Sequence, residues 1–204
     1  MNENDILKGR LKDLANAAFR QNRYTYTNFL SAADMEVFYS NLEQLSFAGY
    51  TIFGGRESCD RVMIAFGNEA DCGYAPAFPI CTMKVSAVSD KFSDDLNHRD
   101  FLGALMNLGI EREMVGDILV TESTHSGKHN NAYIFCVDTV ADYIAENLTK
   151  IRHTNVKCTF CSTQDTDEIQ IKKEPLHIIA ASARADAVTA TITGLSSSSP
   201  SLLF

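Results

Sequence analysis

Apolar residues recur at helical spacing in two stretches near the start of the chain. The first stretch predicts a helix whose apolar stripe consists of Leu7, Leu11, Leu14 and Ala18. A second helix is predicted to begin at Ser31, because Asp34 follows three residues later and completes a capping box. The apolar face of that helix consists of Met35, Phe38, Leu42 and Leu45.

The pattern changes from helical spacing to strict alternation near residue 61. The apolar residues Val62, Ile64 and Phe66 alternate with Arg61, Met63 and Ala65. Such alternation is typical of a strand that is buried on one face only. The pair Gly54–Gly55 predicts the turn that precedes this strand.

A regular succession of elements is predicted from residue 78 onward. Residues 79–88, 117–121, 131–137 and 155–162 are the expected strands. A helix over 98–108 is expected to be capped by Asn97 and Asp100 and to stop at Gly109. A second helix is expected to be capped by Asp138 and to run to about Leu148. The resulting order β-α-β-β-α-β is the split βαβ, or ferredoxin-like, arrangement that RNA-recognition domains also use.

The chain is therefore predicted to be an α+β protein with several parts. We expect an N-terminal helical and β-hairpin subdomain over 1–76 and a ferredoxin-like, RRM-like subdomain over 77–165. Residues 166–181 are expected to be a connecting strand or linker, and 182–204 a further, incomplete module. Because many proteins that do not bind RNA share the ferredoxin-like topology, the fold alone does not assign a function.

The charges are unevenly distributed along the sequence. The net charge of −8 argues against a protein whose whole surface binds nucleic acid. Residues 147–164 nevertheless contain Lys150, Arg152, Lys157 and His153 and no acid, whereas acids concentrate between Glu57 and Glu122. A local basic patch on an acidic protein can still bind phosphate. The basic residues of the first helix are better explained as a solvated face.

Other candidate chemistry in the sequence is weak. Tyr133 and Phe135 share one strand face, where they can stack bases, although packing against a neighbouring element is the favoured interpretation. His125 and His129 in the polar loop 123–131 lack further metal ligands, and Cys158-x-x-Cys161 lacks the second pair of a zinc ribbon. We therefore expect no metal and no cofactor, and no catalytic motif or small-molecule substrate is recognised.

The cysteines and the N-terminus indicate a cellular location. The chain has six irregularly spaced cysteines, and its first residues lack the apolar core of a signal peptide. The sequence contains no apolar run long enough for a membrane helix. We expect reduced thiols in a cytoplasmic protein that does not contact membranes.

The block HRDFLGALMNLGIEREMVGDILV (98–120) resembles the YlmH-like family of bacterial S4-domain RNA-binding proteins. FGGRESCDRVMIAF (53–66), where Arg56 replaces the usual Tyr, and AYIFCVDTVADYIAENLTKI (132–151) are also similar to that family. The family ends in an S4 module, and residues 181–204 resemble its opening, with Arg184 and Asp186 on its R-x-D. The later part of that module is missing from this sequence.

The resemblance implies a non-catalytic RNA-binding protein that associates with the large ribosomal subunit carrying tRNA in translation quality control, with a link to cell division. RNA, either ribosomal RNA or tRNA, is then the expected partner. The residues expected to contact phosphate are Arg56, Arg61, Arg99, Arg112, Lys150, Arg152, Lys157 and Arg184. Two alternatives stay open: a scaffold that docks a basic protein on the acidic surface, and an RNA-modifying enzyme.

Overall fold

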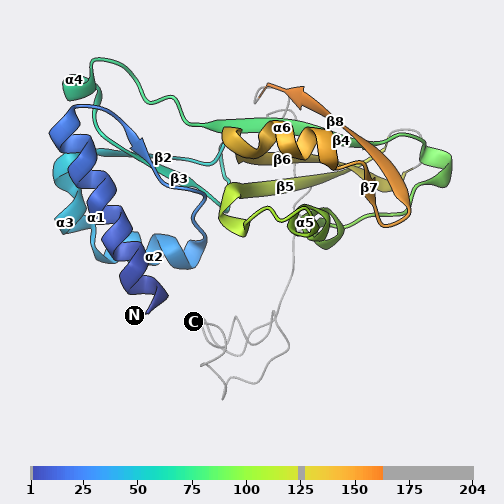
Figure 1. The fold of residues 1–204 in the computed structure, drawn as a ribbon, viewed down its shortest axis with the longest axis horizontal. Coiled ribbons are helices and arrows are strands. Elements are labelled where there is room, and N and C mark those ends of the chain that lie inside the picture. The colour runs from blue at the N-terminus through green and yellow to red at the C-terminus, as the bar shows by residue number, and fades with distance from the viewer. Residues whose placement is uncertain (1, 124–126, 163–204) are drawn as a thin grey trace, which may run out of the picture. The chain divides into compact units, whose positions relative to one another are not determined.

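The computed structural model describes residues 2–123 and 127–162, which all fall within one compact unit (Figure 1). The predictions for residues 166–204, including the S4-like opening and Arg184, and the prediction for His125 lie outside the described residues. No described helix is long and apolar enough to cross a membrane.

Helices and strands alternate along the described chain. The α-helices are α1 (Glu3–Gln21), α2 (Ala32–Ser40), α3 (Leu42–Leu45), α4 (Glu69–Cys72), α5 (His98–Asn107) and α6 (Asp138–Asn147). Short 3-10 turns are η1 (Ser46–Ala48), η2 (Asp90–Phe92) and η3 (Arg112–Met114). The strands are β1 (Thr25–Tyr26), β2 (Tyr50–Phe53), β3 (Met63–Phe66), β4 (Ile80–Ala87), β5 (Val115–Glu122), β6 (His129–Val137), β7 (Lys150–Ile151) and β8 (Thr154–Cys161).

The first part of the chain forms an antiparallel sheet in the order β1-β3-β2, with α1 and α2 packed against it (Figure 1). Leu11 and Ala18 of the predicted stripe are buried, and Ser31 and Asp34 form the predicted capping box. The second helix is shorter than expected, because it ends at Ser40 and Leu42 begins the separate α3.

The prediction that the strand at 62–66 is buried on one face only was wrong. All four residues of β3 are buried, because β3 is the central strand of its sheet and has apolar neighbours on both faces. Ile64 and Phe66 face the core formed with α1 and α2. Met63 faces the other way and packs with Phe135 of β6.

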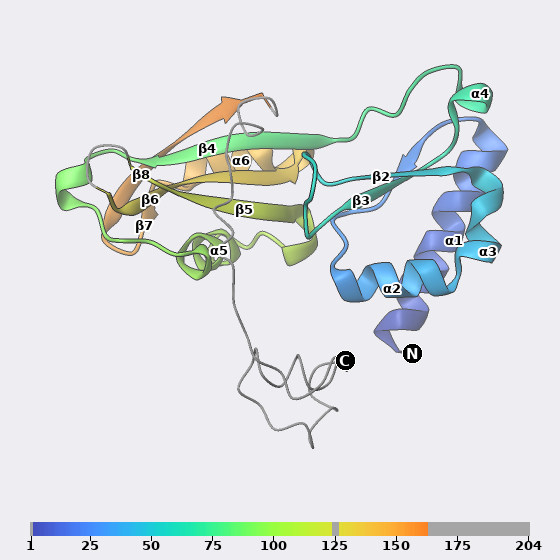
Figure 2. The ribbon, with the colours of Figure 1, turned by 180° about the vertical axis from the view of Figure 1, so that it is seen from behind.

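The second part of the chain forms an antiparallel sheet in the order β5-β6-β4-β8-β7. Its elements follow the predicted order β-α-β-β-α-β, with the two-residue β7 as an unpredicted addition before β8. The helix α6 lies in front of this sheet in Figure 1 and behind it in Figure 2. Phe101 and Leu105 of α5 and Ile144 of α6 pack on the same sheet face, together with Met83 and Val85.

The helix ends of this part follow the sequence closely, with one exception. Asn97 accepts hydrogen bonds from the backbone of Arg99 and Asp100, and the Asp100 carboxylate accepts from the Asn97 backbone, so the predicted capping box is present. Gly109 adopts the expected left-handed conformation. Asp138 does not cap α6; it is the first helical residue, and the N-cap position is Val137.

The two sheets are joined by an apolar cluster of Phe29, Met63, Leu119, Phe135 and Val137. Phe135 is fully buried in this cluster, which confirms that it packs against a neighbouring element. Two glycines leave room for aromatic rings of this cluster. A Cβ atom on Gly55, in the turn after β2, would lie 2.5 Å from the Phe135 ring, and one on Gly116, in β5, would lie 2.5 Å from the Phe29 ring. Side chains at these two positions would separate the sheets.

A Gly55→Ala substitution should lower the free energy of unfolding by about 2 to 4 kcal/mol, because it combines backbone strain at φ +103° with overlap against Phe135. Gly109→Ala is the matched control, because its φ is +81° and no atom lies within 4 Å of the added Cβ. That control should lose about 1 kcal/mol from strain alone. Urea unfolding of both variants measures the difference, and equal losses would contradict the steric role of Gly55.

Candidate nucleic-acid interface

Three of the predicted phosphate-binding residues lie together in one groove of about 440 Å³ between α5 and β7. Arg99 comes from α5, whereas Lys150 and Arg152 come from β7 and the turn that follows it. We call this the α5–β7 groove, and its lining residues are Arg99, Asp100, Gly103, Ala104, Asn107, Leu108, Asn147, Leu148, Thr149, Lys150 and Arg152. The tertiary structure thus brings together cations that lie about fifty positions apart in the sequence.

The side chains of all three cations are exposed, and one of them is paired. The Arg152 guanidinium lies 3.7 Å from the Asp100 carboxylate, the one acid among the residues that line the groove. This carboxylate is also the acceptor of the α5 capping box. An exposed ion pair of this kind contributes little to stability and leaves the guanidinium able to exchange partners. The groove therefore carries an excess of positive charge on a chain whose net charge is −8.

The turn that carries Arg152 is held by a carboxylate outside the groove. Asp94 accepts hydrogen bonds from the His153 backbone N–H at 2.9 Å and from the Thr154 hydroxyl at 3.3 Å, and its own N–H donates to that hydroxyl at 2.7 Å. Arg152 has a φ of +53°, a left-handed conformation that is unusual for an arginine. The Asp94 contacts help to hold this turn, and with it the direction of the Arg152 side chain.

Lys157 does not belong to the groove. Val156 and Cys158 of β8 pack toward the helices, so Lys157 between them lies on the opposite face of the sheet, opposite Ser86 of β4. Lys157 is exposed, like the groove cations. The cations of the acid-free segment 147–164 are thus divided between two surfaces of the sheet, which the sequence could not reveal.

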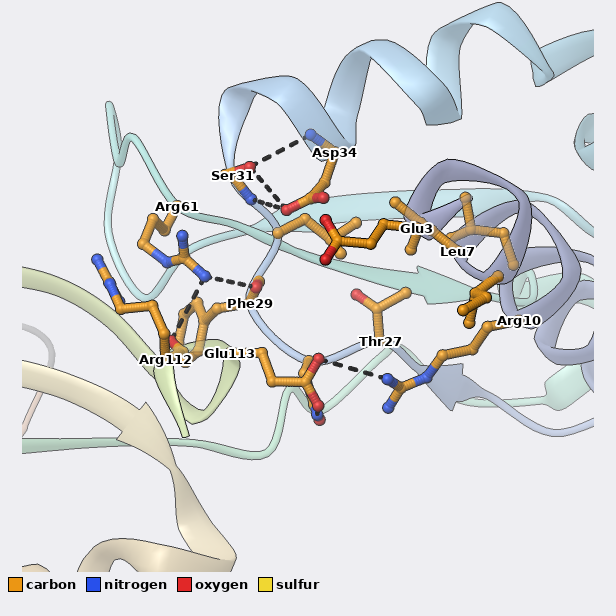
Figure 3. Close-up of a pocket in the computed structure, with 14 residues that line it drawn as sticks. Glu3, Leu7, Arg10, Thr27, Phe29, Ser31, Asp34, Arg61, Arg112 and Glu113 are labelled. Atoms are coloured by element: carbon orange, nitrogen blue, oxygen red, sulfur yellow. Dashed lines mark hydrogen bonds and ion pairs between the residues drawn. The ribbon is translucent and has the colours of Figure 1, made fainter. Parts of the chain in front are cut away.

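Arg61 and Arg112 have their guanidinium groups on backbone carbonyls at the junction of the two sheets. Arg61 donates to the Phe29 carbonyl at 2.9 Å (Figure 3) and to the Val115 carbonyl at 3.1 Å. Arg112 donates to the carbonyls of Val115 and Gly116. Burial lowers the pKa of both guanidinium groups, and for Arg112 the nearby charge of Arg61 lowers it further. These contacts serve the fold, and they occupy donors that phosphate would otherwise use.

Asp117 completes this junction. Its carboxylate accepts from the backbone N–H groups of Asp60 at 2.8 Å and Arg61 at 3.1 Å, which fastens the turn after Gly55 to β5. Arg56 lies in that turn, is partly buried and interacts with other residues. Burial also lowers the pKa of His98, with Arg112 acting in the same direction.

A separate cavity of about 540 Å³ lies beside this junction (Figure 3). Several of its charged residues are used within the fold: Asp34 holds the capping box with Ser31, and Glu113 accepts from Asn28 at 2.7 Å and from Arg10 at 3.5 Å. No histidine or cysteine lines it among the described residues. Likewise, the described residues contain no cluster of three or more His, Cys, Asp or Glu that could hold a metal ion. All six cysteines are free thiols.

The sequence analysis did not predict two contacts of the second sheet. Lys84 on β4 has its ammonium 5.5 Å from the centre of the Tyr133 ring on β6. Alternation within residues 79–88 could have placed Lys84 on the polar face, but only strand pairing sets it opposite Tyr133. The role of Asp94 had no local signal, because its partners lie 59 and 60 positions away.

Replacement of Arg61 by methionine should lower the free energy of unfolding by about 2 to 4 kcal/mol, because the Phe29 carbonyl loses its charged donor and the Val115 carbonyl keeps only that of Arg112. Arg99→Met removes an exposed guanidinium at the surface of α5 and should change stability by less than about 0.5 kcal/mol. Urea unfolding distinguishes the two roles. A small loss in Arg61→Met would contradict the structural role of this arginine.

The hydrogen bond from the His153 backbone holds the pKa of Asp94 below its ordinary value. Because this pKa is lower in the folded state than in the unfolded state, the Asp94 carboxylate stabilises the fold fully above about pH 3.9, the ordinary pKa of an aspartate. This stabilisation is lost as the pH falls through the lower folded-state pKa. The backbone amide resonance of His153 should therefore titrate with a midpoint below about 3.9 in NMR spectra. Asp94→Asn should abolish this titration, and a midpoint above the ordinary value would contradict the assignment.

Comparisons with known proteins concern the part of the chain that contains this groove. Residues 76–165, which contain the whole α5–β7 groove, match the family described as "Putative RNA-binding domain in YlmH". Over 173 residues the chain is 27% identical to "Ribosome-associated protein quality control protein P2" of Bacillus subtilis (strain 168). That alignment covers 85% of this chain and 63% of the relative, so the chain spans less than two thirds of the relative's length.

A solved structure is similar in fold. "Cell division protein ylmH from Streptococcus pneumoniae" matches with a TM-score of 0.60 at 17% sequence identity, over 83% of this chain and 96% of that chain. At this identity the likeness concerns the fold alone. These proteins are named for RNA binding, quality control or cell division and not for an enzymatic activity. The matched domain, the relative and the shared fold together support the resemblance of this chain to the YlmH-like family.

Proposed function

We propose that this chain binds RNA and that the α5–β7 groove contacts the sugar–phosphate backbone. The observation that carries the proposal is the convergence of Arg99, Lys150 and Arg152 on one hollow within the matched RNA-binding domain. Arginine and lysine are the usual phosphate ligands of nucleic-acid-binding proteins, and such contacts supply affinity without reading sequence. We interpret residues 77–165 as a ferredoxin-like domain that presents this groove.

The relative's name supports a finer proposal about the partner. We infer that the RNA is ribosomal RNA or tRNA and that the protein works on the large ribosomal subunit in translation quality control, in the cytoplasm. The name of the structural neighbour supports a link to cell division. Of the other cations predicted from the sequence, Lys157 remains available for phosphate on the second sheet face, whereas Arg61 and Arg112 are used for structure.

Charge reversal of Arg99, Lys150 and Arg152 to glutamate should weaken sedimentation of the chain with purified large ribosomal subunits. In a salt series, loss of three phosphate contacts should also reduce the log–log salt slope by about 2 to 3 units. The control is charge reversal of Lys8, Arg20 and Arg23, which changes the net charge equally on another part of the chain. If both triple variants lost binding to the same extent, the groove assignment would be wrong.

A single substitution separates binding from folding within the same experiment. Arg152→Asn removes the charge and places at the left-handed position a residue that tolerates it better. Its unfolding midpoint should match or exceed that of the unchanged chain, while its affinity for the subunit falls. Binding to purified ribosomal proteins but not to ribosomal RNA would instead support a protein-docking scaffold.

A further inference from the structure

The sheet face opposite α5 and α6 consists of two regions with different surroundings. Its rows follow directly from the strand register, because residues paired across antiparallel strands share one face. One region is apolar and lies at the junction, where Phe135 and Val137 pack in the cluster with Phe29 and Met63. The other region consists of the next two rows, and we call it the distal face. Its residues are Thr159, Lys84, Tyr133 and Leu119 in one row and Lys157, Ser86, Asn131 and Thr121 in the other. Leu119 is buried in the junction cluster, so the first row adjoins that cluster.

The distal face has a composition unlike the chain as a whole. It carries two lysines, one tyrosine, hydroxyl and amide groups and no carboxylate, although the chain has 26 acids and a net charge of −8. The carboxylate of Glu122 in the following β5–β6 pair is engaged by His129 at 3.3 Å. A surface of this composition is complementary to an anion with polar groups. It is a poor match for a basic protein.

Tyr133 gives this surface an aromatic group beside a cation. The Lys84 ammonium lies 5.5 Å from the centre of the Tyr133 ring, and the exposed Lys157 belongs to the neighbouring row. Tyr133 packs against the junction cluster and is only partly buried, so its ring is restrained and still partly exposed. Lysine has a flexible stem and can move its ammonium from the ring to a phosphate.

We propose that the distal face binds single-stranded RNA, with an unpaired base stacked on Tyr133 and the adjoining phosphates neutralised by Lys84 and Lys157. This inference rests on the proposed function and adds to it a second contact surface and a preference for unpaired RNA. Base stacking on a tyrosine needs a splayed-out base, which a duplex does not offer. The α5–β7 groove lies on the helix-covered side, so the two surfaces are separate and can be altered separately.

The chain has no tryptophan, so a Tyr133→Trp variant carries a single fluorophore that can still stack. We expect an unstructured uridine decamer to quench its emission, and a self-complementary RNA duplex of similar length to leave the emission unchanged at saturation. Tyr39→Trp is the matched control, because Tyr39 is an exposed tyrosine on α2, outside both surfaces. Equal quenching of both reporters by the decamer would overturn the proposal.

Affinity measurements provide the second readout. Tyr133→Leu should weaken decamer binding about ten-fold with an unchanged salt slope, because stacking releases no counterions. Tyr133→Phe, which keeps the ring, should bind within about two-fold of the unchanged chain. Circular dichroism should show the same folded spectrum for all three proteins. Equal affinity of the leucine variant and the unchanged chain would contradict stacking on Tyr133.

The two proposals fail in different ways. If the groove triple variant loses affinity and salt slope while the Tyr133→Trp reporter does not respond to the decamer, RNA binding stands and the distal-face proposal fails. If the reporter responds and the groove variant binds normally, the distal-face proposal stands and the groove assignment fails. Lack of binding by the unchanged chain to the decamer, the duplex and the ribosomal subunit would overturn both.

Discussion

Burial of Phe135 against the backbone of Gly55 is the contact on which the arrangement of the two sheets depends. The ring comes from β6 of the second sheet, and the glycine comes from the turn between β2 and β3 of the first sheet. Phe29 and Gly116 make the reciprocal contact, with the ring from the first part and the glycine from the second. Close packing of large rings against bare backbone leaves no room for any side chain larger than hydrogen.

Such a junction also requires partners for the polar backbone groups that it buries. The guanidinium groups of Arg61 and Arg112 donate to carbonyls of Phe29, Val115 and Gly116, and the Asp117 carboxylate accepts from backbone N–H groups of the facing turn. Arginine suits this role because its planar group offers several donors in a fixed geometry. These two arginines therefore have a role in the fold, and their contact with phosphate stays a prediction.

The junction decides which part of the second sheet remains available for partners. The junction covers the rows that contain Phe135 and Val137, and α5 and α6 cover the opposite face of the second sheet. Lys84 and Lys157 of the distal face belong to neither set of contacts, and Tyr133 stays partly exposed although it packs against the junction cluster. The α5–β7 groove lies on the helix-covered side, between α5 and β7. A protein with many more acids than bases thus offers two small acid-poor surfaces. Local charge, more than net charge, sets the attraction for phosphate at short range.

The sequence by itself determined the local elements of this protein. The capping boxes at Ser31 and Asn97, the stop at Gly109 and the alternation of helix and strand after residue 78 depend on neighbours within a few positions, and each was predicted. The resemblance of residues 98–120 to the YlmH-like family was also contained in the sequence, and the comparisons confirmed it. The S4-like opening and the domain boundaries remain predictions.

The tertiary structure alone decided which residues meet. Burial of β3 on both faces, the separation of Lys157 from Lys150 and Arg152, and the use of Arg61 on carbonyls depend on contacts between positions far apart in the chain. Sequence pattern reports the period of an element and the nature of its side chains, but it carries no information about which element lies on the other side. An arginine has the same charge in a binding groove and on a buried carbonyl, and only its long-range neighbours distinguish the two.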